Sequence, residues 1–206
     1  MRSLFNADSW LWKPLGWLGD LVMLSLLWAF CSIPLVTLGP ACAAVYDAAV
    51  HAVRRKEDTV ITRFLHTFKR DLKQGILSGL FWAGVVLLPG LLLYALLRFV
   101  PFFAERWPLV LVVAAALGFF LLCVLCWVWP TLSRFAMGLG ALHVTAVKLA
   151  FGHILRSAAM ALIWVAALGA GLRYAFAFFV APGLAAYLST YLIEPVFRPF
   201  EEQEQT

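Results

Sequence analysis

The sequence predicts an all-α protein that crosses a membrane several times, and three observations lead to this. Of its 206 residues, 64% are hydrophobic and only 13% are charged, whereas a soluble domain is typically about half apolar and about a quarter charged. Five apolar segments are long enough to cross a bilayer, which takes about 20 helical residues. Nine tryptophans fit membrane–water interfaces, because the indole is apolar but carries an N–H donor. We therefore expect a single transmembrane domain over residues 1–206, built as a multi-pass transmembrane helical bundle.

The five expected spans follow the chain in order. They cover residues 15–38, 75–100, 107–129, 154–171 and 176–196. Only four residues separate the last two spans, so we expect a tight hairpin there. The first connection is long and holds two more expected helices. An Ala-rich helix begins at Pro40, where a missing N–H costs nothing, and an amphipathic helix follows Thr59, a suitable N-cap.

The amphipathic segment after Thr59 predicts a helix at the membrane interface. Its apolar residues recur at i, i+3 and i+4 spacing, which places them on one face of a helix. They are Ile61, Phe64, Leu65, Phe68 and Leu72. Four basic residues form the opposite side, namely Arg63, Lys69, Arg70 and Lys73. We expect the apolar residues to face lipid or the bundle, and the basic residues to face headgroups or cytosol.

The distribution of Lys and Arg predicts the orientation of the spans. Eleven basic residues fall on the side of the first connection and five on the other, and cytoplasmic loops carry the excess of positive charge. This places the N-terminus outside and the C-terminus in the cytoplasm. The formal net charge of +5 is then explained by topology and anionic headgroups rather than by nucleic acid.

The stretch from Pro34 to Pro40 predicts a structural elbow at the cytoplasmic membrane boundary. A proline removes a backbone hydrogen bond, and in lipid the freed groups need partners. Thr37 can donate to a freed carbonyl, and Gly39 removes a side chain where helices must approach each other. Pro40 then starts the next helix. The elbow residues are therefore Pro34, Thr37, Gly39 and Pro40.

A weak internal repeat accompanies this pattern. Each unit reads as an apolar span, a proline (Pro34 or Pro130), a connecting helical segment and another span. Both first spans run in the same direction, so the repeat would be parallel, with the fifth span left over. Asp47, with His51 four residues later on the same face, and Arg134 occupy equivalent places. They form either a polar contact across the repeat or two unrelated interfacial charges.

Other residues allow a packing interpretation beside a functional one. Gly75 and Gly79 start a small-x-x-x-small series that permits close helix contact within the chain or between subunits of a homo-oligomer. Cys123 and Cys126 form a C-x-x-C within an apolar run, where packing is favoured over redox or metal chemistry because nothing there stabilises a thiolate. The sequence contains no phosphate-binding loop and no nucleophile elbow. We expect no enzyme activity and no cofactor.

Two blocks in the first 80 residues resemble the YesL-like family of bacterial integral membrane proteins, which carry a domain of unknown function. The first block is "LFNADSWLWKPLGWLGDLVMLSLLWAFCSIPLVTLGPACAAVYDA" and the second is "FLHTFKRDLKQGI". The family often has an Asn in the first span, where this chain has "MLSLLW", so Ser25 would have to make any polar contact there. The resemblance implies a place in the bacterial cytoplasmic membrane, near carbohydrate uptake systems and sensor proteins.

Two function hypotheses follow. The first is a non-enzymatic accessory or regulatory partner of a carbohydrate ABC uptake system, with ABC permease subunits or a membrane sensor protein as partners besides membrane lipids. The alternative is a small-solute transporter or channel that acts as an oligomer. A transporter should have several buried polar residues facing one cavity, and the sequence offers few.

Overall fold

The computed structural model describes residues 12–100, 106–135 and 137–204, and these ranges contain helices and turns but no strand. The all-α class is confirmed. The helices are α1 (Trp12–Cys31), η1 (Leu35–Thr37), α2 (Leu38–Ala48), η2 (Ala49–Arg54), α3 (Val60–Phe99), α5 (Trp107–Arg134), α6 (Leu139–Gly152), α7 (Ile154–Arg173), α8 (Ala175–Phe178) and α9 (Ala181–Glu204). Here η1 is a 3-10 helix and η2 is a π-helix.

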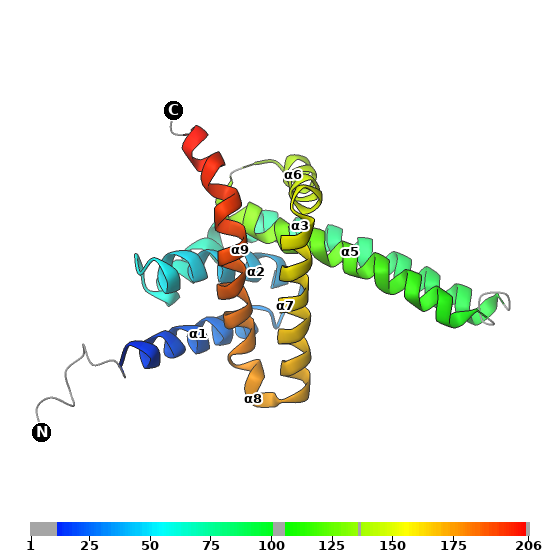
Figure 1. The fold of residues 1–206 in the computed structure, drawn as a ribbon, viewed down its shortest axis with the longest axis horizontal. Coiled ribbons are helices and arrows are strands. Elements are labelled where there is room, and N and C mark those ends of the chain that lie inside the picture. The colour runs from blue at the N-terminus through cyan, green and yellow to red at the C-terminus, as the bar shows by residue number, and fades with distance from the viewer. Residues whose placement is uncertain (1–11, 101–105, 136, 205–206) are drawn as a thin grey trace, which may run out of the picture.

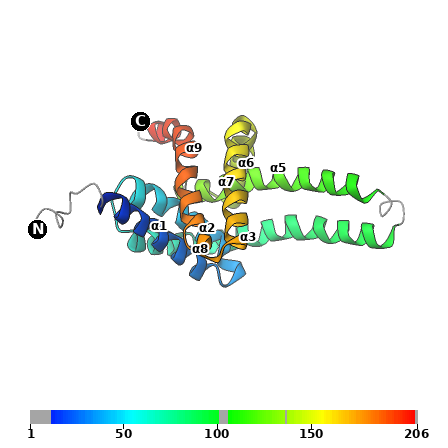
Figure 2. The same ribbon diagram turned by 60° about the horizontal axis from the view of Figure 1, so that its bottom comes forward.

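The molecule has two regions that differ in shape (Figure 1). The second part of α3 and the first part of α5 run side by side away from the other helices, and Figure 2 shows the same projection from another direction. We call residues 83–99 and 107–122 the arm and the other described residues the body. None of the described side chains of the arm is buried. The helices α7 and α9 belong to the body and run crosswise to the arm in both views.

Helix α3 is longer than the sequence pattern suggests. It has 40 residues, which at 1.5 Å per residue makes it about 60 Å long. The expected amphipathic helix and the expected second span are thus one continuous helix. It begins at Thr59, whose side chain accepts a hydrogen bond from the Thr62 N–H at 3.4 Å. It ends at Phe99, because Val100 precedes a proline and adopts an extended conformation.

Four helical stretches among the described residues are long and apolar enough to cross a membrane, so the chain has the character of a membrane protein. They are 35–54, 60–99, 107–134 and 154–173. The last three contain the third and fourth expected spans, and the second except for its last residue. The expected first span, 15–38, is interrupted, because α1 ends at Cys31 shortly before Pro34, where the residue before a proline disfavours helix. The expected fifth span, 176–196, falls on α8 and α9, and neither helix is among the four stretches found in the described residues.

The two prolines that suggested a repeat have different effects. The chain leaves the helix before Pro34, but α5 continues through Pro130 to Arg134. Pro130 lies in a run of buried residues, 127–133, and this packing maintains the helix despite the lost hydrogen bond. The two units therefore differ at the position that defined the repeat.

Helix α2 lies in the middle of the body. Nine of its eleven residues are buried, and five of these are Gly or Ala. It contacts α1, α3, α5 and α9. Small side chains allow this many helices to approach one backbone closely. Larger buried side chains from the surrounding helices, such as Leu21, Leu24, Phe64 and Trp127, complete the core.

The face that the first half of α3 buries in the body overlaps the expected apolar face only in part. The buried positions recur at three- and four-residue steps and include polar and small residues as well as aromatic ones. They are Val60, Phe64, Thr67, Asp71, Gly75, Ser78 and Trp82. Of the expected apolar face, Phe64 is buried and Phe68 packs against the core, whereas Ile61, Leu65 and Leu72 are exposed.

Candidate functional site

The most concentrated chemistry of the body is a set of buried ion pairs around α2 and η2. Tyr46 and Asp47 are adjacent in α2, and each contributes to one cluster. Burial of charge is unfavourable unless the charges are paired and hydrogen-bonded. The partners of these groups therefore determine what the site can do.

Asp47 has a side chain only 1% exposed and receives several hydrogen bonds. Arg63 donates to both carboxylate oxygens, with Nη2 at 3.1 Å from Oδ1. The Thr67 hydroxyl donates to Oδ2 at 2.6 Å, and His51 Nε2 lies 3.7 Å from Oδ1. The bidentate geometry is the one that Arg favours with carboxylates. This cluster fixes α2 to the first half of α3.

Glu194 on α9 forms the second cluster, and its side chain is 3% exposed. Arg134 at the end of α5 donates to Oε1, and Arg55 donates to Oε2 at 2.9 Å. The Tyr46 hydroxyl donates to Oε1 at 3.2 Å. One buried carboxylate therefore connects α2, the residue after η2, α5 and α9.

Asp47 and Arg134 do not pair with each other, so the first of the two alternatives left open by the sequence is wrong. Asp47 points to Arg63 on α3, and Arg134 points to Glu194 on α9. The reason is that Asp47 and Tyr46 follow each other in a helix and so face different neighbours. Glu194 lies within the fifth expected span, 176–196. Its sequence signal was an acidic residue inside an apolar span, which by default marks a functional or structural contact.

The basic residues of the first half of α3 also divide into two pairs. Arg63 turns inward to Asp47, and Arg70 binds Asp71 with contacts of 2.7 and 2.8 Å and the Ser133 carbonyl at 2.7 Å. Lys69 and Lys73 are exposed. Two of the four expected interfacial cations therefore hold the body together, because the carboxylates they need lie on or beside the buried face.

The elbow between α1 and α2 is compact. The Thr37 hydroxyl lies 2.6 Å from the Cys31 carbonyl oxygen and 2.7 Å from that of Pro34. A Cβ added at Gly39 would lie 2.3 Å from the Gly75 carbonyl oxygen and 2.9 Å from the Trp129 ring. A Cβ added at Gly75 would lie 2.8 Å from Pro40. The two glycines thus allow α2 and α3 to touch through their backbones.

Gly79 contributes less to this contact than Gly75. A Cβ added there would lie 3.9 Å from the Cα and the N of Gly39, which is an ordinary van der Waals separation. Within the small-residue series, Gly75 therefore makes a close contact inside the chain, whereas Gly79 leaves room for a side-chain Cβ.

A second close crossing joins α1 and α9 through Ser25. Its hydroxyl donates to the Leu21 carbonyl at 3.0 Å and accepts from the Gly183 N–H at 2.9 Å. Gly183 lies in the first turn of α9, where N–H groups lack intrahelical partners. A Cβ added at Gly183 would lie 2.5 Å from the Leu21 carbonyl oxygen. Ser25 thus makes a polar contact in the expected first span.

Strained and charged features meet where η2 ends. A π-helix is rare and is frequently found at functional sites, and η2 is followed by Lys56, whose φ of 60° is uncommon for a residue with a side chain. Lys56 Nζ lies 2.6 Å from Asp20 Oδ2. Asp20 belongs to the first expected span, 15–38, and Lys56 to the connection that follows it. Their contact places both at the same end of the molecule, so α1 does not separate them by a membrane thickness.

A hydrogen bond also connects η2 to the turn that follows it. His51 Nδ1 pairs with Glu57 Oε2, and this bond lowers the pKa of Glu57 below its ordinary value. Within the described ranges, no group of three or more His, Cys, Asp or Glu residues is placed to hold a metal ion. The carboxylates of both clusters are occupied by internal donors. The arrangement therefore acts as an ionic clamp between helices.

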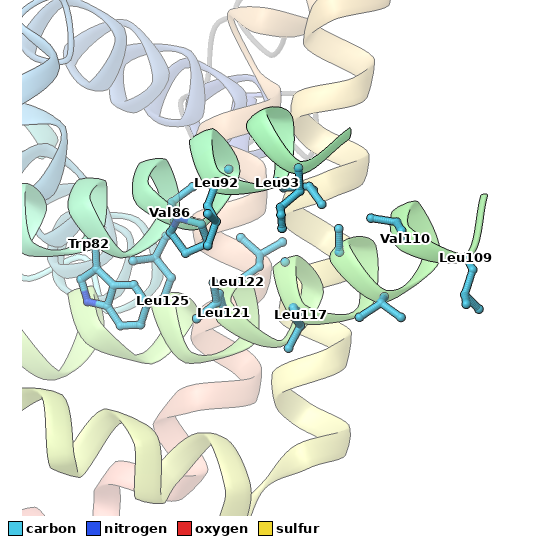
Figure 3. Close-up of a pocket in the computed structure, with 16 residues that line it drawn as sticks. Trp82, Val86, Leu92, Leu93, Leu109, Val110, Leu117, Leu121, Leu122 and Leu125 are labelled. Atoms are coloured by element: carbon cyan, nitrogen blue, oxygen red, sulfur yellow. The ribbon is translucent and has the colours of Figure 1, made fainter. Parts of the chain in front are cut away.

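Two cavities accompany the clamp, and both are lined almost entirely by apolar groups. One, of about 230 Å³, lies inside the body among α1, α2, α5, α7 and α9, with Trp28, Trp129 and Trp164 in its wall. The other, of about 810 Å³, is a groove between α3 and α5 along the arm. Figure 3 shows its leucine and valine side chains and Trp82 at the end nearest the body.

Comparison with known proteins gives one positive result. Neither the curated proteins nor the solved structures contain a match to this chain. The matching family model covers the end of α1 from Leu21, the elbow, α2, η2 and most of α3. Residues 21–94 match the family described as "Protein of unknown function, DUF624", which is consistent with the family resemblance of the first 80 residues.

Proposed function

We propose that this chain is a non-enzymatic integral membrane protein that acts as an accessory or regulatory partner of a carbohydrate uptake system. The observation that carries the proposal is the outer surface of the arm. Leu87, Leu88 and Leu91 on α3 and Val112 on α5 are each 66–71% exposed. The body offers no comparable projection, so the arm is the element best placed to contact another membrane protein.

The clamp supports the same proposal. Its ion pairs join α2, α3, α5 and α9, which include both helices that continue into the arm. Such networks can carry energetic coupling between distant sites. A shift of α3 or α5 caused by a partner on the arm would therefore reach the body through these ion pairs. The choice of a carbohydrate importer as the partner rests on the family resemblance. That resemblance implies a place near carbohydrate uptake systems.

Site-specific photo-crosslinking tests the proposal. A photoreactive residue is placed at Leu88 on the arm and, as a matched control, at Leu155 on α7, which is 84% exposed. We expect crosslinks from position 88 to the ABC permease subunits expressed in the same cell, and none from position 155. Deleting the chain should lower sugar uptake. Equal crosslinking from both positions, or unchanged uptake, would contradict the proposal.

The alternative function, transport by an oligomer, gives a different result in a simpler system. If the purified chain takes up a sugar or another small solute in proteoliposomes without a partner, it is a transporter. We expect no uptake, since the groove along the arm and the cavity inside the body have apolar walls and a solute path needs polar groups.

We further propose the bacterial cytoplasmic membrane as the location, with the N-terminus outside and the C-terminus in the cytoplasm. The eleven-to-five distribution of basic residues supports this. A cysteine at Ala7 should react with an impermeant reagent added from outside, and a cysteine at Gln203 should not. The Asp20–Lys56 contact makes position 7 the decisive one, because protection there would place the N-terminus on the side of Lys56.

A further inference from the structure

We propose that the outer side of α3, where the helix approaches the arm, binds one anionic phospholipid. The site consists of two lysines followed by two leucines, and we call it the lipid strip: Lys69, Lys73, Leu77 and Leu80. Successive members are three or four residues apart, which places them on one side of the helix. All four residues are exposed. The proposal is independent of the partner function, which rests on leucines farther along the arm.

The two lysines of the strip have no counterion from the protein. Among the described residues, neither ammonium group makes an ion pair or a hydrogen bond, and Asp71, which lies between the lysines in the sequence, is buried and pairs with Arg70. Like charges four residues apart weaken a helix slightly. The lysines are about 6 Å apart along the helix axis, so the two unbridged oxygens of one phosphodiester can pair with both. A phosphate at this place therefore relieves the repulsion.

Beyond the lysines, α3 continues as a long stretch without charge. Residues 74–97 contain no Asp, Glu, Lys or Arg, and Leu77 and Leu80 are 46% and 53% exposed. One leaflet supplies about half of the 30 Å hydrocarbon thickness, or about 15 Å. This length corresponds to about ten residues of helix and extends from Lys73 to Ala83. An acyl chain whose phosphate lies at the lysines therefore runs past both leucines.

The sequence of charge and apolar surface selects the ligand. A free phosphate, or an acidic protein segment in water, would pair with the lysines but leave Leu77 and Leu80 against water. A symmetric contact with a second copy would bring the same lysines together, and their charges repel each other. Basic residues beside an apolar span attract anionic lipids, whereas the ammonium group of a zwitterionic headgroup is repelled by the lysines. The strip therefore fits an anionic phospholipid.

Photolabelling of the full chain in vesicles tests the proposal. The vesicles consist of phosphatidylcholine with a small fraction of phosphatidylglycerol that carries a diazirine in one acyl chain. In a second series the diazirine is carried by phosphatidylcholine instead. We expect labelled peptides around Leu77 and Leu80 to be severalfold more abundant with the phosphatidylglycerol probe. Excess unlabelled phosphatidylglycerol should compete for this labelling, and inorganic phosphate should not.

Lysine variants separate this site from general attraction to an anionic membrane. Lys73→Gln should lower the preference for phosphatidylglycerol at the strip severalfold, and combining it with Lys69→Gln should abolish the preference. Lys73→Arg should retain it, because the positive charge remains. The matched variant Lys148→Gln removes another exposed lysine, on α6, and should leave the preference unchanged. All four variants change only exposed side chains, so we expect folded, monodisperse protein in each case.

Four outcomes would overturn the proposal. Equal labelling by the two probes in the parent would mean ordinary lipid contact only. A preference that persists in the double variant would show that the lysines do not select the lipid. Competition by inorganic phosphate would indicate a site for a free anion. An amine crosslink between two copies through Lys69 would assign the strip to a second copy.

Discussion

The body and the arm contain the same apolar residue types but are held together differently. In the body, helices touch through glycine backbones, a shared serine and buried carboxylates. In the arm, two long apolar helices run beside each other with a groove between them and no buried residue. In lipid, apolar side chains gain little by leaving hydrocarbon for each other, so small and polar residues decide where helices associate. The close glycine contacts and the buried polar groups of the body therefore determine how its helices associate.

The largest effect is expected for Glu194→Gln in the body. Removing this charge takes away the buried carboxylate that Arg134 and Arg55 share, and breaking a buried pair typically costs about 3–5 kcal/mol. Thermal unfolding in mild detergent should therefore shift strongly downward. The matched variant Asp20→Asn breaks the exposed pair with Lys56, which should cost at most about 1 kcal/mol. If the two variants lower the melting temperature equally, the buried ion pairs of the clamp stabilise the fold no more than an exposed pair does.

A large effect is also expected for Gly39→Leu at the elbow. The new side chain would collide with the Gly75 carbonyl and the Trp129 ring, and overpacking typically costs about 1–3 kcal/mol or more. Loss of monodispersity or a lower melting temperature should result. Gly84→Leu in the arm, where a Cβ meets nothing within 4 Å, should be neutral. A Gly39 variant as stable as the parent but altered in activity would instead indicate a pathway through this stretch.

A smaller effect is expected for Ser25→Ala. It leaves the buried Gly183 N–H without its acceptor, and an unsatisfied buried donor costs about 1–3 kcal/mol. Ser189 is an equally buried serine, but its hydroxyl binds the Ala185 carbonyl within its own helix. Ser189→Ala should therefore change the melting temperature much less. If the two serine variants behave alike, the crossing of α1 and α9 does not depend on this contact.

The smallest effect is expected at Glu57, whose carboxylate is about half exposed. Because the folded state lowers its pKa, the stabilisation is present above the ordinary value of about 4.3 and disappears as pH falls through the lower folded value. At neutral pH, Glu57→Gln should cost less than about 1 kcal/mol. The difference in melting temperature between variant and parent should vanish in strongly acidic buffer. A constant difference would rule out the charge as its cause.

The sequence predicted the helical class and the three most apolar spans, because these depend on composition over about 20 residues. It also predicted that Thr37 and Gly39 would serve an elbow, since proline chemistry is local. It did not predict the partner of any buried charge. Arg63 and Arg70 carry the periodicity of a solvated face, yet their carboxylates come from α2 and from the adjacent residue. The partner of a buried charge depends on which helices pack against each other, and a local sequence pattern does not show this.

The length of α3 has a mechanical consequence. The helix is held by Asp47, Ser133 and Met137 through contacts in its first half, while its second half runs free of the body to Phe99. From residue 75 to residue 99 it extends about 36 Å. A rotation of about 5° about the Gly75 contact would therefore displace the far end by about 3 Å, using the same 1.5 Å rise per residue. With the Gly39–Gly75 contact as the pivot, a small repacking near Gly39 would produce a larger displacement at the far end of the helix.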